Sequence, residues 1–233
     1  AKFEKEQIEQ RYLRKVRFMF KNKEIFLIID DTLVYREGKK IEEAQTHFDH
    51  NENKYVRGHQ FFTALLYTPF IQLPIFPKLY SKNTDSKIEM ARTLVDKLSK
   101  AKIKIDTILF DSWYADEELM KKCFYNKIRI IGSIKSNRKI MFYKKRKWRS
   151  LSYVSEYINS QKTIILNLEN HKYKVYSNKA KLHHLPLMRL IISQELDENN
   201  KMIGKAHLVS SNPNDTPENI ILTYKIRWKI ETF

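Results

Sequence analysis

The stretch EIFLIIDDT, from Glu24 to Thr32, decides the fold. Its five consecutive apolar residues, Ile25 to Ile29, predict a strand that is buried on both faces, as in the centre of a mixed sheet. The two carboxylates that follow, Asp30 and Asp31, stand at the predicted C-terminal end of this strand. Because side chains alternate along a strand, only one of the two can point to a given face. An acid in this place is either a turn residue or a ligand held on a rigid base.

Two further buried strands follow, and helical patterns precede each of them. The first strand, Ile105 to Asp111, also ends in a carboxylate, and the second is Arg129 to Ser133. An amphipathic helix is predicted over Asp85 to Lys100, and another helix begins at Asp116, which suits the N-cap position. The alternation of strands and helices predicts an α/β fold.

The segment between the first strand and the first of these helices has a weaker pattern. We interpret residues 33–50 as a polar loop and residues 54–67 and 71–80 as two strands of a hairpin or meander. His47, His50 and His59 lie here, but no helix or carboxylate frames them at a recognisable ligand spacing. We therefore predict that they are structural histidines and not a metal site.

Charge and composition indicate the class of partner. The chain has 44 Lys and Arg residues against 27 Asp and Glu residues, a net charge of +17, which favours a nucleic acid or an anionic membrane surface. No apolar run reaches the ~18 residues of a membrane span. The single cysteine, Cys123, excludes an internal disulfide and favours a reducing, cytoplasmic setting. The chain begins at Ala1 and stops inside a helical pattern, so we expect it to be an excerpt of a longer protein.

Basic residues are concentrated in residues 135–149, where no acid occurs. Phe142, Tyr143 and Trp148 are interleaved with them. A solvated basic loop is one interpretation, but basic and aromatic residues together are typical of a surface that follows phosphates and stacks on bases. The predicted DNA-binding residues here are Lys135, Arg138, Lys139, Lys144, Lys145, Arg146, Lys147, Trp148 and Arg149. Short strands predicted up to Ser211 make this a β-rich region, in which we assign no role to His183 and His184.

The last helix is predicted to begin near Thr216 and Pro217, with Asp215 as the alternative cap. At ~100° per residue, Tyr224, Arg227 and Glu231 share one face of it. Taken alone, this stripe is most simply a solvated, salt-bridged face. Asp111 and one acid of the Asp30/Asp31 pair change that interpretation, because divalent cations neutralise clustered carboxylates and oxygen-only ligands suit Mg²⁺ or Mn²⁺.

With these residues the sequence resembles the catalytic domain of the DDE transposases of bacterial insertion sequences, the IS-four-type group with a Y-(2)-R-(3)-E signature. The segments that carry the resemblance are Ile29–Thr32, Phe110–Asp116, His207–Ser211, and Tyr224 with Arg227, Trp228 and Glu231–Phe233. The last of them is the most specific. The resemblance extends from about Glu24 to Phe233.

The resemblance implies a ribonuclease-H-like α/β fold: a mixed sheet flanked by helices, with a β-rich insertion before the last helix. Residues 24–134 and 212–233 would form the catalytic core, 135–211 the insertion, and 1–23 the tail of an upstream helical element. Because the family's first acid precedes a threonine, Asp31 is the implied ligand, with Asp30 in reserve. Asp111 and Glu231 would be the second and third ligands, and Tyr224, Arg227 and Trp228 would contact DNA.

The implied activity is DNA cleavage and strand transfer at transposon ends by two-metal phosphodiester chemistry with Mg²⁺ or Mn²⁺. The implied partners are double-stranded DNA with terminal inverted repeats, target DNA and a second copy of the chain in a synaptic complex. We expect a prokaryotic, nucleoid-associated protein that does not bind a membrane. Two alternatives remain open: a ribonuclease-H-like nuclease without strand transfer, and a DNA-binding derivative that has lost catalysis.

Overall fold

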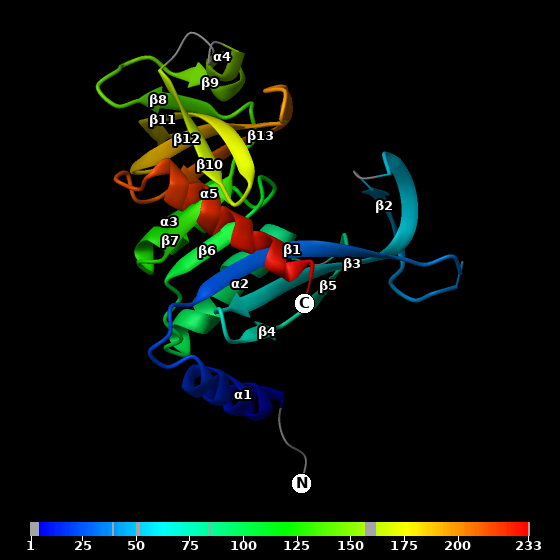
Figure 1. Cartoon of the computed structure of the whole chain (residues 1–233). Coiled ribbons are helices and arrows are strands. Elements are labelled where there is room, and N and C mark those ends of the chain that lie inside the picture. The colour runs from blue at the N-terminus through cyan, green and yellow to red at the C-terminus, as the bar shows by residue number, and fades with distance from the viewer. Residues whose placement is uncertain (1–4, 39, 50–51, 84, 157–161, 233) are drawn as a thin grey trace. The chain divides into compact units, whose positions relative to one another are not determined.

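The computed structural model describes residues 5–38, 40–49, 52–83, 85–156 and 162–232, which form helices and mixed sheets (Figure 1). The chain divides into two compact units: the first is Ala1–Asp106 with Phe233, and the second is Thr107–Thr232. The α/β composition, with helices flanking mixed sheet, agrees with the predicted ribonuclease-H-like fold. His50 lies outside the described residues, and so does the end of the short helix that the sequence predicts over residues 151–158.

The first unit combines two helices with antiparallel strands. Its elements are α1 (Lys5–Met19), β1 (Phe26–Tyr35), β2 (Gln45–Asp49), β3 (Lys54–Tyr67), β4 (Gln72–Pro74), β5 (Lys78–Tyr80) and α2 (Lys87–Lys100). β1, β2, β4 and β5 all pair with β3. A capping box of Ser86 and Glu89 starts α2, whose buried residues are Met90, Ala91, Leu94, Val95 and Leu98.

β1 is longer than predicted, and this corrects two expectations. Asp30 pairs with Thr63 and Asp31 with Phe62, so both acids lie inside the strand and not at its end. The predicted loop over residues 33–50 holds the last part of β1 and the whole of β2. The long strand β3 provides the reason, because it supplies backbone partners as far as Tyr35. The predicted strand over residues 71–80 is two short strands, β4 and β5.

The two described histidines of this unit have local contacts. His47 is buried beside the ring of Tyr80, and burial is the main cause that lowers its pKa. His59 Nε2 lies 2.8 Å from the carbonyl oxygen of Glu42. Both side chains therefore contact other residues of this unit.

The second unit contains the rest of the strands and the terminal helix. Its elements are β6 (Thr107–Phe110), α3 (Glu117–Tyr125), β7 (Arg129–Ser133), β8 (Lys139–Phe142), β9 (Arg149–Ser150), α4 (Leu151–Glu156), β10 (Thr163–Leu168), β11 (His171–Leu182), β12 (Leu187–Leu196), β13 (Met202–Ser210), α5 (Pro217–Lys225) and the 3₁₀ helix η2 (Ile226–Ile230). The strand order is β6-β7-β13-β12-β11-β8-β9, and β10 pairs with β11. β6 and β7 are parallel, as expected for strands joined through a helix.

The β6–β7 pair is packed tightly at its C-terminal end. Gly132 in β7 is the parallel partner of Phe110 in β6. A Cβ atom at Gly132 would lie 2.4 Å from Cε2 of the buried Phe110 ring. The ring therefore occupies the place of a side chain at position 132, which explains why a glycine interrupts the apolar run of β7.

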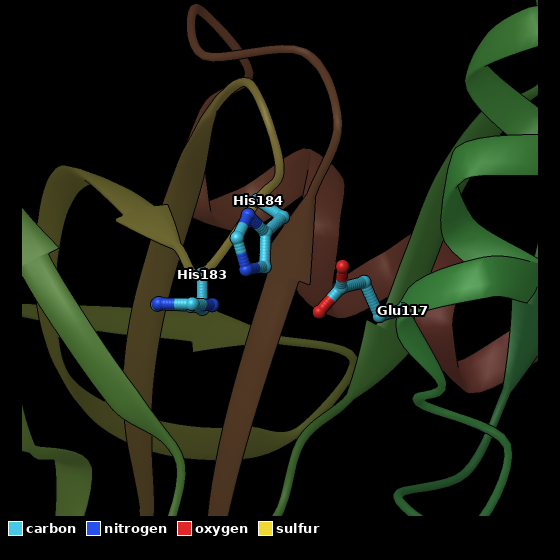
Figure 2. Close-up of side chains that lie close together, drawn as sticks. All are labelled: Glu117, His183 and His184. Carbon is cyan, nitrogen blue, oxygen red and sulfur yellow. The ribbon is translucent and has the colours of Figure 1, made fainter.

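The predicted β-rich region is confirmed, with longer strands than expected. Glu169 and Asn170 form the turn between β10 and β11, and both have positive φ, 48° and 66°. β13 pairs with β12 and also with β7, so the strands of this region continue the sheet that begins at β6. The turn between β11 and β12 carries His183 and His184, which lie close to Glu117 at the start of α3 (Figure 2).

Candidate active site

Asp111 directly follows the buried strand β6, as predicted, and its own loop orients it. Oδ1 accepts hydrogen bonds from the backbone N–H groups of Trp113 at 2.9 Å and Tyr114 at 3.4 Å. The fully buried Tyr114 side chain fixes this loop. Within the described chain no residue donates a hydrogen bond to Oδ2 of Asp111. One oxygen is thus held in place while the other remains available to a ligand.

The terminal helix begins as predicted and ends differently. Thr216 is the N-cap, its hydroxyl accepts from the N–H of Asn219 at 3.3 Å, and Pro217 occupies the first turn. The prediction of a continuous α-helix through Glu231 is wrong, because residues Ile226–Ile230 form the 3₁₀ helix η2. With three residues per turn, η2 buries Arg227 and Ile230. Glu231 follows η2 with a half-exposed side chain.

The guanidinium group of Arg227 is buried between two aromatic rings. Its central carbon lies 4.5 Å from the ring centre of Trp228 and 5.8 Å from that of Tyr224. Its Nη2 lies 3.7 Å from Oε1 of Glu231. Such stacking stabilises a desolvated cation. Arg227 therefore contacts the rings of Tyr224 and Trp228 and partly neutralises the carboxylate of Glu231.

Tyr224 connects this cluster to Asp111. Its hydroxyl is hydrogen-bonded with Ser133 at the end of β7 and with Arg227. Burial raises the pKa of Tyr224 and the Arg227 charge opposes the shift, while the Asp111 charge adds to it. β6 and η2 are in contact. The structure therefore brings together Asp111, Tyr224 and Arg227, and Glu231 follows on the same terminal segment.

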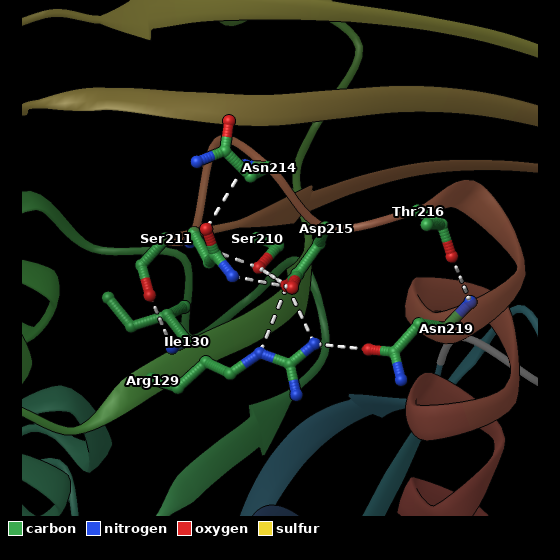
Figure 3. A network of polar contacts seen from close by, with 9 residues as sticks. Arg129, Ile130, Ser210, Ser211, Asn214, Asp215, Thr216 and Asn219 are labelled. Atoms are coloured by element: carbon green, nitrogen blue, oxygen red, sulfur yellow. Dashed lines mark hydrogen bonds and ion pairs between the residues drawn. The ribbon is translucent and has the colours of Figure 1, made fainter.

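A polar network anchors the start of the terminal helix to β7 (Figure 3). Arg129 donates to Oδ2 of Asp215 from Nε at 3.0 Å and from Nη2 at 2.6 Å, and Nη2 also donates to Asn219. The hydroxyl of Ser210 donates to the same carboxylate. Asp215 is therefore engaged with β7 and β13, and the alternative capping box at Asp215 does not form.

The first predicted acid lies in the other unit, where a cation binds it. Oδ2 of Asp31 accepts from Nζ of Lys87 at 2.9 Å and from Nε2 of Gln60 at 2.5 Å. Oδ1 of Asp30 accepts from the N–H of Asp31 at 2.9 Å. Both are partly buried strand residues of β1. Asp31 thus has a charged partner that the sequence did not indicate, 56 residues away.

The basic side chains of residues 135–149, the basic segment, are exposed, and two of them contact the loop that follows Asp111. Nζ of Lys135 lies 4.6 Å from the ring centre of Trp113, and Arg138 donates to the carbonyl oxygen of Ala115. The predicted residues Lys139, Lys144, Lys145, Arg146, Lys147, Trp148 and Arg149 are also exposed. The segment therefore places its positive charge next to the Asp111 loop.

A pocket of the second unit was not predicted. Its lining includes Ser112, Ser133 and Tyr224, together with Lys135 and Lys205. Ser133 had a weak signal, since it ends an apolar strand, and Lys205 had none. The pocket extends from the residue after Asp111 to the basic segment.

The donor set fits a hard divalent cation. Asp111 offers the oxygen atom Oδ2, and Glu231 offers a carboxylate that is 48% exposed. Oxygen ligands of this kind suit Mg²⁺ or Mn²⁺. Arg227 lies within ion-pair distance of Glu231, so a positive charge stands next to that carboxylate.

Comparison with known protein families gives two overlapping matches. Residues 1–151 match the model described as DDE superfamily endonuclease. Residues 78–233 match the model described as archaeal putative transposase ISC1217. A comparison with curated proteins gave no match. Each family match covers more than half of the chain, and the second includes Asp111 together with the terminal segment. The chain therefore belongs to the DDE superfamily of endonucleases and transposases.

Proposed function

We propose that this chain is the catalytic part of a DNA transposase that cleaves DNA at the ends of its element and joins the freed ends to target DNA. One observation carries the proposal: two segments more than 100 residues apart in the sequence meet where β6 contacts η2. One segment supplies an oriented carboxylate, Asp111, and the other supplies Tyr224, Arg227 and Glu231. The family matches support a transposase-type nuclease.

The proposed metal ligands are Asp111 and Glu231 with Asp31, and Asp30 is the reserve for Asp31. Two Mg²⁺ or Mn²⁺ ions at such a site would activate a water or a 3′-hydroxyl and neutralise charge on the leaving oxygen. The loop of Asp111 keeps one carboxylate oxygen fixed, which holds the other in a constant direction. Lys87 must release Asp31 when that carboxylate takes up a cation.

The proposed DNA surface combines the basic segment with the terminal residues. Trp228 is 53% exposed and can stack against DNA. The charges of the basic segment suit phosphates next to the Asp111 loop. The contacts predicted for Tyr224 and Arg227 with a phosphate stay predictions, since both side chains also hold the end of the helix.

Several finer expectations remain part of this proposal. They are membership of the IS-four-type group, action as a homodimer on paired terminal repeats, a nucleoid-associated location, and division into a core (24–134 and 212–233), an insertion (135–211) and an upstream tail (1–23). No helix in the described ranges is long and apolar enough to cross a membrane.

The test is a cleavage and joining assay with the full-length protein and DNA that carries the terminal repeats of its element. We expect cleavage that requires Mg²⁺ or Mn²⁺, and loss of both cleavage and joining in Asp111→Asn and in Glu231→Gln. Glu118→Gln and Glu218→Gln are matched controls, because they remove an acid from the first turn of α3 and of α5. Both controls should keep activity.

Three outcomes would change the proposal. Cleavage that survives Asp111→Asn or Glu231→Gln would show that the site has been wrongly assigned. Cleavage without any joined product, with both carboxylates required, would favour a nuclease over a transposase. DNA binding without either reaction in the unaltered protein would indicate a derivative that has lost catalysis.

A further inference from the structure

The turn between β11 and β12 brings two adjacent histidines to the start of α3 (Figure 2). Glu117 is the first residue of α3, directly after the N-cap Asp116. His184 has a left-handed backbone conformation, with φ of 56°, and the rings of His183 and His184 lie 3.8 Å apart between centres. Both rings thus stay together at one point of the surface, next to a carboxylate.

The three side chains have the spacing of a metal site. One ligand atom from each residue can be chosen so that all three atoms lie within 4.8 Å of one another. In a tetrahedral zinc site with bonds of about 2.0–2.1 Å, ligand atoms are separated by about 3.4 Å. The difference is small enough for side-chain rotation to close, because both histidines are exposed and Glu117 is only partly buried.

We propose that Glu117, His183 and His184 bind one Zn²⁺ ion, or a similar late first-row divalent ion, with water as a fourth ligand. Two imidazoles and one carboxylate are a ligand set that zinc uses in proteins, whereas Mg²⁺ prefers oxygen ligands alone. This site is therefore distinct in chemistry from the carboxylates Asp111 and Glu231, and it is not required by the proposed function.

The neighbouring charges allow Glu117 to act as a ligand. Nζ of Lys121 lies 2.6 Å from Oε1 of Glu117 and 2.9 Å from Oε1 of Glu118. When Glu117 turns to a metal ion, Lys121 keeps Glu118 as its partner.

A bound ion would connect two parts of the second unit. Glu117 stands six positions after Asp111, at the far end of the same loop, and the histidines belong to the β-rich region. His183 also packs against Trp148 of the basic segment, with ring centres 5.5 Å apart. The ion would connect the loop of the candidate active site to the strands that carry the DNA-binding charge. It would thereby restrict the motion of this loop.

The experiment measures metal binding by the full chain without DNA. Zn²⁺ is titrated into chelator-treated protein by calorimetry, and Co²⁺ is used as a spectroscopic probe of tetrahedral coordination. We expect one equivalent of tightly bound Zn²⁺, a rise in Tm with Zn²⁺ but not with equal Mg²⁺, and tetrahedral Co²⁺ absorption. The variant His183→Ala/His184→Ala should bind Zn²⁺ at least about tenfold more weakly and lose the Co²⁺ signal.

Matched variants separate this site from the others. His171→Ala removes an exposed histidine at the start of β11, where it pairs with Glu195 at 2.6 Å, and should bind Zn²⁺ normally. Asp111→Asn and Glu231→Gln should also keep the tight Zn²⁺ site, whatever they do to cleavage. Unchanged Zn²⁺ affinity in the double histidine variant would overturn the proposal. Loss of the tight site in Asp111→Asn or Glu231→Gln would overturn it as well, since the ion would then belong to the carboxylates.

Discussion

Two acids predicted for the same purpose, Asp31 and Asp111, have opposite surroundings. Asp31 lies in the middle of β1 and is bound by the ammonium group of Lys87 and the amide of Gln60. Asp111 lies just beyond β6, and from the described residues it accepts only two backbone N–H groups, both through one oxygen. The side chain of Lys87 is only 10% exposed, so its pairing matters for stability. Asp31 therefore contributes to the fold of its unit, whereas Asp111 is oriented without being neutralised.

The largest expected effect concerns Asp111. In Asp111→Asn the amide oxygen can still accept from Trp113 and Tyr114, so the loop keeps its hydrogen bonds. We expect DNA cleavage to fall at least about a thousandfold, because several kcal/mol of charge stabilisation by metal are lost. The free energy of unfolding should change by less than about 1 kcal/mol. Cleavage assays and urea unfolding of the same preparation check both values. A large loss of stability would contradict the prediction that Asp111, unlike Asp31, contributes little to the fold.

The second effect concerns Asp31. Asp31→Asn leaves the nearly buried ammonium group of Lys87 without its anion, which costs about 2 kcal/mol of unfolding free energy, less than for a fully buried pair. Adding Lys87→Met should restore part of this loss, because the uncompensated charge is removed. Urea unfolding of the two single variants and the double variant measures the coupling. Additive effects would show that the ion pair contributes nothing.

The third effect tests the anchor of the terminal helix. Asp215→Asn weakens the charge-assisted hydrogen bonds from Arg129, and we expect a loss of about 1–2 kcal/mol in unfolding free energy. Glu218→Gln, three residues further along, is the control and should be neutral. If the anchor positions Glu231, cleavage in Asp215→Asn should also fall at temperatures well below its Tm. Normal cleavage at these temperatures would show that the network contributes to stability but does not position Glu231.

The fourth effect is a pH dependence, which is absent at neutral pH. Burial, aided by the charge of Lys205, lowers the pKa of His207 from 6.5 to about 4. Between these values His207 binds more protons in the unfolded chain than in the folded chain, so its contribution to stability rises as pH increases from about 4 to 6.5. In His207→Gln this contribution should disappear. Thermal unfolding across this pH range measures it, and identical slopes for both proteins would contradict the shift.

The sequence predicted the elements whose signals are local. The apolar runs before Asp30 and Asp111, the cap at Asp116, and Thr216 with Pro217 all appear as expected. Each depends on neighbouring residues alone, through burial on both faces or through a side chain that accepts from the first turn.

What the sequence could not predict depends on distant partners. β1 continues past Asp31 because β3 pairs with it along its length, and Lys87 reaches Asp31 from the first turn of α2. The change to a 3₁₀ helix after Lys225 accompanies the burial of Arg227 and Ile230, which the residue pattern alone did not indicate. Of the candidate site, the acids could be named in advance, but their surroundings could not.

The 3₁₀ helix at the end of α5 has a mechanical consequence. A 3₁₀ helix advances about 2.0 Å and turns about 120° per residue, compared with about 1.5 Å and 100° in an α-helix. If the five residues of η2 adopted α-helical geometry, Glu231 would retreat by about 2.5 Å and swing by about 100° around the axis. The winding of η2 therefore sets the position and the direction of the Glu231 carboxylate.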